Sequence, residues 1–233
     1  MHSLRHPASL PLGNTLPRAA RIRLASVSRA VRAQEEEVLV PEGETPGCWH
    51  FIDTGAVALS SSSRGGRRCI LSIVGAGGLF GPSLSQTNDG RSARPEARAL
   101  VASTLLLVPA AALDRLLAED GSFGAWMCAT LQRQCDRFQK SLALTLGRPL
   151  PERLLETFAL LAHTHGRPTA EGVFIPFPLR QERMASLVGA SRESVNRALK
   201  RLERAGIVRR AGRSYVVCAS LLAQEEAFGE MPP

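Results

Sequence analysis

Aromatic residues are scarce in this 233-residue chain, which contains one Tyr, two Trp and eight Phe. Any core must therefore rest mainly on Leu, Val, Ala and Phe, and the length allows one or two domains. No apolar run approaches the roughly 20 residues that a membrane-spanning helix needs, so no membrane association is expected. The first 34 residues contain six Arg and no acidic residue, but they lack the apolar centre of a secretory signal. The expected location is cytoplasmic.

The five Cys residues form neither a Cys-x-x-Cys pair nor a spacing typical of zinc sites. The closely spaced pair His163 and His165 falls on a predicted helix, where residues two positions apart point to different faces. No metal site is therefore expected, and the chain is not expected to be an enzyme. A metalloenzyme built on a jelly roll remains as an alternative, because such a fold holds its metal with clustered His and carboxylate side chains.

Positive charge is concentrated near the C-terminus. The whole chain carries a net charge of +8, with a pI near 10.2. Residues 178–213 alone contain ten basic and three acidic side chains, a net charge of +7. Such a concentration favours a polyanionic partner, and double-stranded DNA is the partner expected here.

Short β-favouring runs separated by Gly, Pro and Ser occupy residues 38–108. They are centred on residues 38–40, 49–52, 56–59, 69–74, 97–101 and 105–108. Several strands at this spacing are typical of a β-sandwich or roll. We therefore expect a β-roll sensor domain over residues 25–118, a double-stranded β-helix of the jelly-roll kind, after a disordered basic tail at residues 1–24.

The hydrophobic period changes after Pro109 and predicts helices over residues 110–117, 122–146 and 152–165. The second helix should begin at an N-cap, Ser122, and end before Gly147. Its apolar residues alternate by four and three positions, as in the a/d seam of a coiled coil, and the opposite face is polar. We expect a dimerisation segment at 119–147 and a homodimer, with an ordinary core stripe as the alternative. The two Cys residues of this seam could have a redox role or could serve only in packing, and both interpretations are left open. The seam consists of Gly124, Cys128, Leu131, Cys135, Phe138 and Leu142.

Residues 179–209 have the pattern of a helix-turn-helix. Ala185 is small where the two helices would approach, Gly189 supplies the turn, and Val195 would anchor the second helix to the first. Ser191 is placed to cap that second helix. Two short strands around residues 211–213 would then form a basic wing. The sequence thus predicts a winged helix-turn-helix domain over residues 148–223, followed by a tail at 224–233.

The outward residues of the second helix match the chemistry of DNA. Arg can bind guanine through two hydrogen bonds, Glu can accept from cytosine, and Asn can pair with adenine. The residues expected to contact bases are Arg192, Glu193, Asn196 and Arg197. Those expected to contact phosphates, which add salt-dependent affinity but little sequence choice, are Ser191, Lys200, Arg201, Arg204 and Arg213.

These motifs resemble the cAMP receptor protein/FNR (Crp/Fnr) superfamily of bacterial transcriptional regulators over about residues 25–220. Residues 191–197 resemble its recognition-helix signature, 55–59 its glycine-containing hairpin, and 79–81 the start of its effector cassette. The resemblance implies an α+β chain with a cyclic-nucleotide-binding-like roll, a long dimerisation helix and a winged helix-turn-helix. It also implies a homodimer on a palindromic operator, contacts to bases from Arg192, Glu193 and Arg197, and a variable, site-tuning position at Asn196. An activator would also have RNA polymerase as a partner.

The effector site departs from the family's cAMP-binding pattern. After Phe-Gly those proteins carry a Glu that holds the ribose hydroxyl, whereas this chain has Pro82 after Gly81. Arg91 and Ser92 could supply the phosphate-binding Arg-Ser pair, but alignment from the strand at residue 105 places residues 94–95 there instead. The absence of one polar partner from a buried site costs about 1–3 kcal/mol, so cAMP is not the expected effector.

The chain also departs from the patterns of residues that bind adenine, an iron–sulfur cluster or haem. The position that contacts adenine in the family falls near Phe138, with Gln139 beside it. An FNR-type iron–sulfur cluster needs several Cys near the N-terminus, and residues 1–47 contain none. His50 is the candidate that a haem would need, but it falls on a predicted strand and is interpreted as structural. No cofactor is assigned, and a cyclic-nucleotide-binding module that acts on a protein partner instead of DNA remains an alternative.

Overall fold

The computed structural model describes residues 16, 18–63, 65–82, 94–145 and 148–218. It divides into two compact units, Met1–Phe138 and Gln139–Pro233. The boundary lies inside helix α3 (Gly121–Thr145), so that most of this helix belongs to the first unit. The sequence predicted this helix as a dimerisation segment at 119–147. The predicted C-terminal tail at 224–233 lies outside the described residues.

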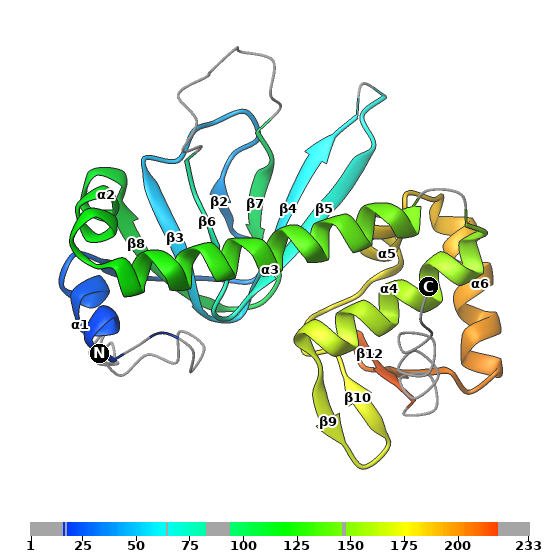
Figure 1. Cartoon of the computed structure of the whole chain (residues 1–233). Coiled ribbons are helices and arrows are strands. Elements are labelled where there is room, and N and C mark those ends of the chain that lie inside the picture. The colour runs from blue at the N-terminus through cyan, green and yellow to red at the C-terminus, as the bar shows by residue number, and fades with distance from the viewer. Residues whose placement is uncertain (1–15, 17, 64, 83–93, 146–147, 219–233) are drawn as a thin grey trace, which may run out of the picture. The chain divides into compact units, whose positions relative to one another are not determined.

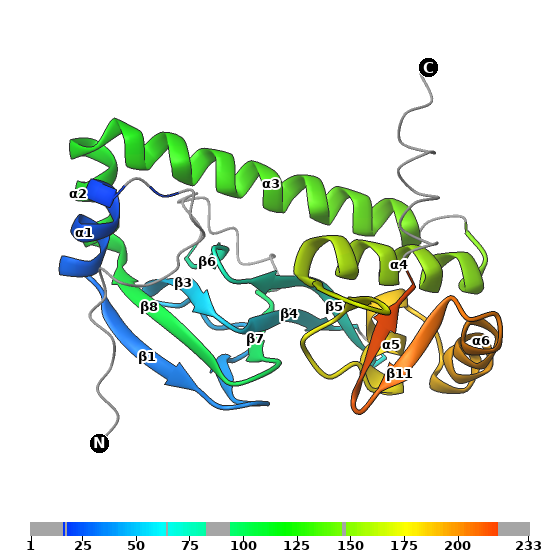
Figure 2. The same cartoon turned by 90° about the horizontal axis from the view of Figure 1, so that it is seen from below.

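The first unit is a β-roll of two antiparallel four-stranded sheets (Figures 1 and 2). One sheet has the order β1-β8-β3-β6, and the other has the order β2-β7-β4-β5. The strands of the first sheet are β1 (Arg29–Ala33), β8 (Ser103–Pro109), β3 (Cys48–Thr54) and β6 (Leu79–Phe80). Those of the second are β2 (Val38–Val40), β7 (Glu96–Ala99), β4 (Ala56–Ser62) and β5 (Arg68–Gly75). The predicted roll is confirmed.

Alternating strand residues build two cores. Ile52 and Leu105 point into the roll, where they join Val57 and Val74 from the other sheet. Their neighbours in the strands face the opposite side, because successive side chains of a strand alternate between faces. That second face packs against helices and includes Trp49, Phe51, Leu79, Leu106 and Val108.

Three helices cover this second face: α1 (Arg18–Ser26), α2 (Ala110–Glu119) and the first part of α3. The prediction of disorder through residue 24 is wrong for residues 18–24, because Ala20 and Leu24 of α1 are buried in the core. These apolar residues recur with helical spacing between arginines, a pattern that the high charge of the segment obscures. Residues 1–15 of the predicted tail lie outside the described residues.

The start of α3 differs from the prediction by two residues. Asp120, and not Ser122, caps the helix, because its Oδ1 accepts hydrogen bonds from the backbone amides of Ser122 and Phe123 at 3.0 and 3.1 Å. The Ser122 hydroxyl donates to the same oxygen at 2.6 Å. These hydrogen bonds, first that of the Ser122 side chain, hold the pKa of the Asp120 carboxyl below its ordinary value. The cap therefore carries a negative charge at the positive end of the helix dipole.

The second unit is a winged helix-turn-helix. It contains α4 (Leu150–His165), α5 (Gln181–Val188) and α6 (Arg192–Arg204), and a four-stranded antiparallel sheet of order β11-β12-β10-β9. The wing strands β11 (Val208–Ala211) and β12 (Ser214–Val217) lie close to the predicted positions. The sequence did not predict the hairpin of β9 (Arg167–Thr169) and β10 (Gly172–Phe174), which extends the wing sheet through the pairing of Val173 with Val217. The architecture predicted for the chain, an α+β fold of roll, long helix and winged helix-turn-helix, is confirmed.

Candidate nucleic-acid interface

The turn between α5 and α6 depends on one glycine. Gly189 has φ 62° and ψ 39°, a left-handed conformation that costs other residues energy. A side chain there would meet no atom within 4 Å, so the constraint is the backbone angle and not space. The Gly189 and Ala190 amides both donate to the Ala185 carbonyl, the second at 3.1 Å. Ala185 thus closes the first helix, and the chain is set to enter α6.

Ser191 caps α6 as the sequence indicates. Its Oγ accepts a hydrogen bond from the Ser194 amide at 3.2 Å, and its own backbone is extended. Glu193 lies in the first turn, where the pKa of its carboxyl is lowered. Its own backbone amide contributes most to this shift, the Ser191 side chain contributes next, and Arg192 and Arg197 add favourable charge. Glu193 therefore stays ionised and acts only as a hydrogen-bond acceptor at neutral pH.

Helix α6 has one apolar face and one charged face. Its buried residues pack against α4 and α5 and are Val195, Ala198, Leu199 and Leu202. At 3.6 residues per turn, the face directly opposite consists of four exposed residues, namely Glu193, Arg197, Lys200 and Arg204. Arg204, which the sequence assigned to phosphates, therefore shares the face of the candidate base-contacting residues Glu193 and Arg197. Arg201 is exposed on one flank.

Two side chains on the candidate surface are held by neighbours in α5. Arg192 Nη1 lies 3.3 Å from Glu182 Oε1, and their side chains are 61% and 72% exposed. An ion pair so exposed is worth about 0–1 kcal/mol, and so it leaves Arg192 available to a stronger acceptor. Asn196 is half-buried, and its Oδ1 accepts a hydrogen bond from Gln181 Nε2 at 2.8 Å. Gln181 and Glu182 carried no sequence signal because these contacts are tertiary.

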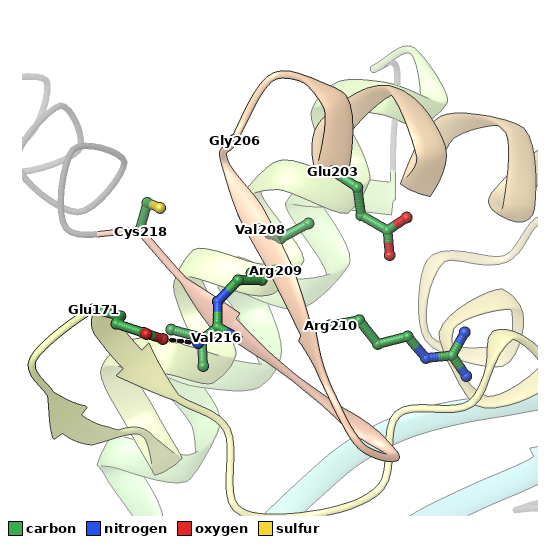
Figure 3. A pocket seen from close by; sticks show the side chains of 8 residues that line it. All are labelled: Glu171, Glu203, Gly206, Val208, Arg209, Arg210, Val216 and Cys218. Carbon is green, nitrogen blue, oxygen red and sulfur yellow. Dashed lines mark ion pairs between the residues drawn. The ribbon is translucent and has the colours of Figure 1, made fainter.

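The wing adds further arginines with different surroundings. Gly212, with φ 60°, forms the turn between β11 and β12, and Arg213 beside it is exposed. Figure 3 shows Arg209 reaching toward Glu171 of the β9–β10 hairpin, with which it forms an ion pair, while Arg210 points away from it. Both arginines line an open hollow of about 550 Å³, together with Glu171, Glu203, Gly206, Val208, Val216 and Cys218. The Glu171 carboxylate partly offsets the positive charge on this side of the wing.

Of the five candidate effector residues, the structure describes Gly81, Phe138 and Gln139. Gly81 packs so closely on Trp49 that an added Cβ would lie 2.5 Å from the indole ring, which explains the glycine by packing alone. Phe138 and Gln139 are exposed on α3. The remaining two, Arg91 and Ser92, lie outside the described residues.

Two further contacts in the roll escaped the sequence reasoning. Gln134 of α3 forms a pair of hydrogen bonds with the backbone of Leu79 in β6, each 2.9 Å long. This clamp ties α3 to the strand just before Gly81. His50 is buried and stacks on Phe80, with ring centroids 4.6 Å apart and planes 8° apart. Burial lowers the pKa of the His50 imidazole, which is therefore neutral at pH 7.

Most residues of the predicted dimer seam are exposed on α3, whereas Leu131 packs against the core of the first unit. Cys128 and Cys135 are exposed, Phe138 and Leu142 are 42% and 50% exposed, and Leu131 is half-buried. Residues of α3 about a third of a turn away face the roll and are buried, namely Phe123, Trp126, Met127 and Thr130. The helix therefore carries a second apolar stripe, of which Cys128, Cys135, Phe138 and Leu142 are exposed.

The closely spaced histidines, His163 and His165, lie in the last turn of α4. Within the part of the chain that the structure describes, no group of three or more His, Cys, Asp or Glu residues could hold a metal ion. His165 packs edge-on against Phe177, with ring centroids 5.5 Å apart. Among the described helices, none is long and apolar enough to cross a membrane.

Comparison with known proteins connects both units with one family. A model of the cyclic nucleotide-binding domain matches residues 30–120, and a model of the Crp-like helix-turn-helix domain matches residues 152–221. The CRP-like cAMP-activated global transcriptional regulator of Mycobacterium tuberculosis is 29% identical over 184 residues, which cover 77% of this chain and 79% of that protein. The cyclic AMP receptor protein of Thermus thermophilus is 27% identical over 221 residues, or 91% of this chain and 94% of that protein.

Solved structures share the same architecture. The c-di-GMP responsive global regulator CLP of Xanthomonas campestris superposes with a TM-score of 0.72 at 18% sequence identity, over 87% of this chain and all of that one. Both predicted domains are thus matched in this chain, in the predicted order, and its similarity to a global transcriptional regulator covers 77% of it. The chain belongs to the Crp/Fnr family and is a DNA-binding transcriptional regulator.

Proposed function

We propose that this regulator acts as a homodimer that binds a palindromic operator through α6. The observation that carries the proposal is the charged face of α6, on which Glu193, Arg197, Lys200 and Arg204 lie opposite the buried stripe. A helix with such a face fits the major groove, and two of them related by a twofold axis would enter successive grooves about 34 Å apart. Palindromy of the operator would then mirror the symmetry of the protein.

Each residue of the candidate surface has a proposed role. Arg192 and Arg197 bind guanine through O6 and N7, Glu193 accepts from cytosine N4, and Asn196 contacts a third base. The charge of Glu193 at neutral pH supports its role as acceptor. The proposed phosphate contacts supply affinity that depends on salt, and they come from Ser191, Lys200, Arg201, Arg204 and Arg213.

The exposed stripe of α3 supports the homodimer. Cys128, Leu131, Cys135, Phe138 and Leu142 follow the a/d spacing of a coiled coil, and burial of such a stripe against a twofold mate would remove it from water. In a parallel pair of helices, Cys128 would face Cys128 of the other copy and Cys135 would face Cys135.

The roll is the proposed sensor, and its effector is not cAMP. Several relatives are named for cAMP and one solved structure for c-di-GMP, so that one roll serves different effectors in different proteins. In this chain Pro82 stands where the family's Glu would hold the ribose, and Phe138 and Gln139 stand near the adenine position. An effector in the roll would act by favouring one of two arrangements of the DNA-binding domains.

A binding experiment tests the DNA proposal. After selection of the operator from random oligonucleotides, Arg197→Ala should weaken specific binding by about tenfold or more per half-site, because its bidentate pair with guanine can no longer form. The matched control is Arg201→Ala, which should weaken operator and random DNA alike and reduce the salt slope by about one for each phosphate that is no longer neutralised. Operator binding unchanged by Arg197→Ala would contradict the base-contact assignment.

Oxidative cross-linking tests the dimer. With copper(II) phenanthroline as the oxidant, two thiols lose two electrons and two protons and form one disulfide, so most of the chain should run as a covalent dimer on a non-reducing gel. The double variant Cys128→Ser/Cys135→Ser keeps the other three cysteines and should stay monomeric on that gel. Equal cross-linking of this variant would show that the copies meet elsewhere.

A further inference from the structure

The hydrogen bond between Gln181 and Asn196 joins α5 to the charged helix α6. Gln181 is the first residue of α5, and Asn196 lies on the flank of α6 between its buried stripe and its exposed face. Because Nε2 of Gln181 donates to Oδ1 of Asn196 at 2.8 Å, the carbonyl side of the Asn196 amide is turned toward α5. Both side chains are half-buried, which limits their freedom to reorient.

The orientation of this amide decides what Asn196 can recognise. An Asn side chain that is free to turn binds adenine with both atoms, since Oδ1 accepts from N6 and Nδ2 donates to N7. When Oδ1 is held by Gln181, the outward group is Nδ2, which carries two N–H donors and no acceptor. Among the described residues, no hydrogen-bond acceptor is engaged by Nδ2. Guanine offers such a donor two acceptors in the major groove, N7 and O6, whereas adenine offers only N7.

We propose that Gln181 is a specificity-determining positioning residue that holds Asn196 as a hydrogen-bond donor. The operator should therefore carry guanine in preference to adenine at the base that Asn196 contacts, although Asn usually pairs with adenine. Gln181 achieves this through Asn196 and without touching that base. The inference rests on the proposed function, in which α6 enters the major groove.

Two substitutions of Gln181 should change the preference in a defined way. Gln181→Leu removes the donor, frees the Asn196 amide to turn, and should move the guanine-to-adenine ratio toward adenine by about tenfold. Gln181→Glu replaces the donor by a carboxylate, which can only accept, so it should draw Nδ2 toward α5 and turn Oδ1 outward. Adenine or cytosine, whose N6 and N4 groups are donors, should then be preferred over guanine.

The neighbouring residue in α5 provides a matched control. Glu182 contacts Arg192 and not Asn196. Glu182→Gln should therefore leave the preference at the Asn196 base unchanged. Because the measured quantity is the ratio of affinities among four bases at one position, a uniform gain or loss of affinity cancels. Repulsion of phosphates by the carboxylate that Gln181→Glu introduces is one such uniform effect.

The experiment uses the full-length chain and duplexes with all four bases at each operator position. Fluorescence anisotropy measures the affinity of wild type and of the Gln181, Glu182→Gln and Asn196→Ala variants, and thermal melting confirms that each folds. Asn196→Ala should remove all preference at one base pair, which identifies its contact. Guanine favoured by wild type at that pair, with the predicted shifts in both Gln181 variants, supports the inference.

The outcomes separate the two proposals. If Asn196→Ala removes the preference at one base pair but both Gln181 variants keep the wild-type preference there, Gln181 does not act through Asn196 and the inference is overturned. The inference also fails if Asn196→Ala changes no position, while a loss of binding by Arg197→Ala would leave the proposed function standing. Failure of wild type to select any sequence would instead overturn the proposed function.

Discussion

Helices α3 and α6 are both amphipathic, yet they leave opposite kinds of surface exposed. In α6 all the large apolar side chains lie in the buried stripe, which has Val195 and Leu199 at its centre, and the opposite face is charged. In α3 one apolar stripe is buried against the roll, and a second, with Phe138 and Leu142, remains in contact with water. One helix has all its apolar contacts within the chain, and the other does not.

This difference assigns the two helices different partners. A charged face is well hydrated, so α6 needs no partner for stability and gains one only where a polyanion replaces its water and counterions. Burial of apolar surface contributes a favourable free energy of about 25 cal/mol for each Å² removed from water, so α3 gains stability from any apolar surface that covers its exposed stripe. DNA therefore fits α6, and a second copy of the same stripe fits α3.

The most severe way to break the comparison is to place a charge in the buried stripe of α6. Val195 is fully buried, and Val195→Asp leaves an unpaired buried charge that costs about 3–5 kcal/mol. We expect unfolding of the second unit and loss of all DNA binding, measured by circular dichroism and anisotropy. Lys200→Asp, which places the same side chain on the exposed face, should weaken DNA binding but keep the melting temperature. Similar melting of both variants would contradict the division of α6 into two faces.

Charges in the exposed stripe of α3 should have the opposite signature. Phe138→Glu/Leu142→Glu should leave each unit folded but separate the copies, because like charges would meet across the twofold axis. Light scattering should then report a monomer, and operator affinity should fall by roughly 100-fold or more as the second half-site is lost. Gln132→Glu/Lys140→Glu, two exposed positions outside the stripe, serve as the control and should remain dimeric. A dimeric stripe variant would place the interface elsewhere.

The same comparison shows what the sequence could predict. The helix-turn-helix was predictable because its requirements are local: a glycine with positive φ at 189, a cap at 191 and apolar residues at helical spacing. The stripe of α3 was predictable for the same reason. Contacts between residues far apart in the sequence left no local signal. Examples are Gln134 with Leu79, 55 positions apart, and Gln181 with Asn196, 15 positions apart. Strands of two or three residues, such as β6 and β9, are too short to show a period.

The smallest predicted effect compares how the two helices begin. Asp120 caps α3 and Ser191 caps α6, but only the Asp side chain titrates. The pKa of Asp120 is lowered in the folded protein, chiefly by the hydrogen bond from the Ser122 side chain, so its contribution is complete above the unfolded value of about 3.9. The contribution is then lost as the pH falls through the lower folded value. Asp120→Ala should therefore destabilise the first unit at pH 7, and by less at pH 3, which lies below the unfolded value. Ser191→Ala should cost about 1 kcal/mol in the second unit with no such dependence on pH. Thermal melting at both pH values measures the two effects, and an equal pH dependence in both variants would show that the charge of Asp120 does not contribute to its cap.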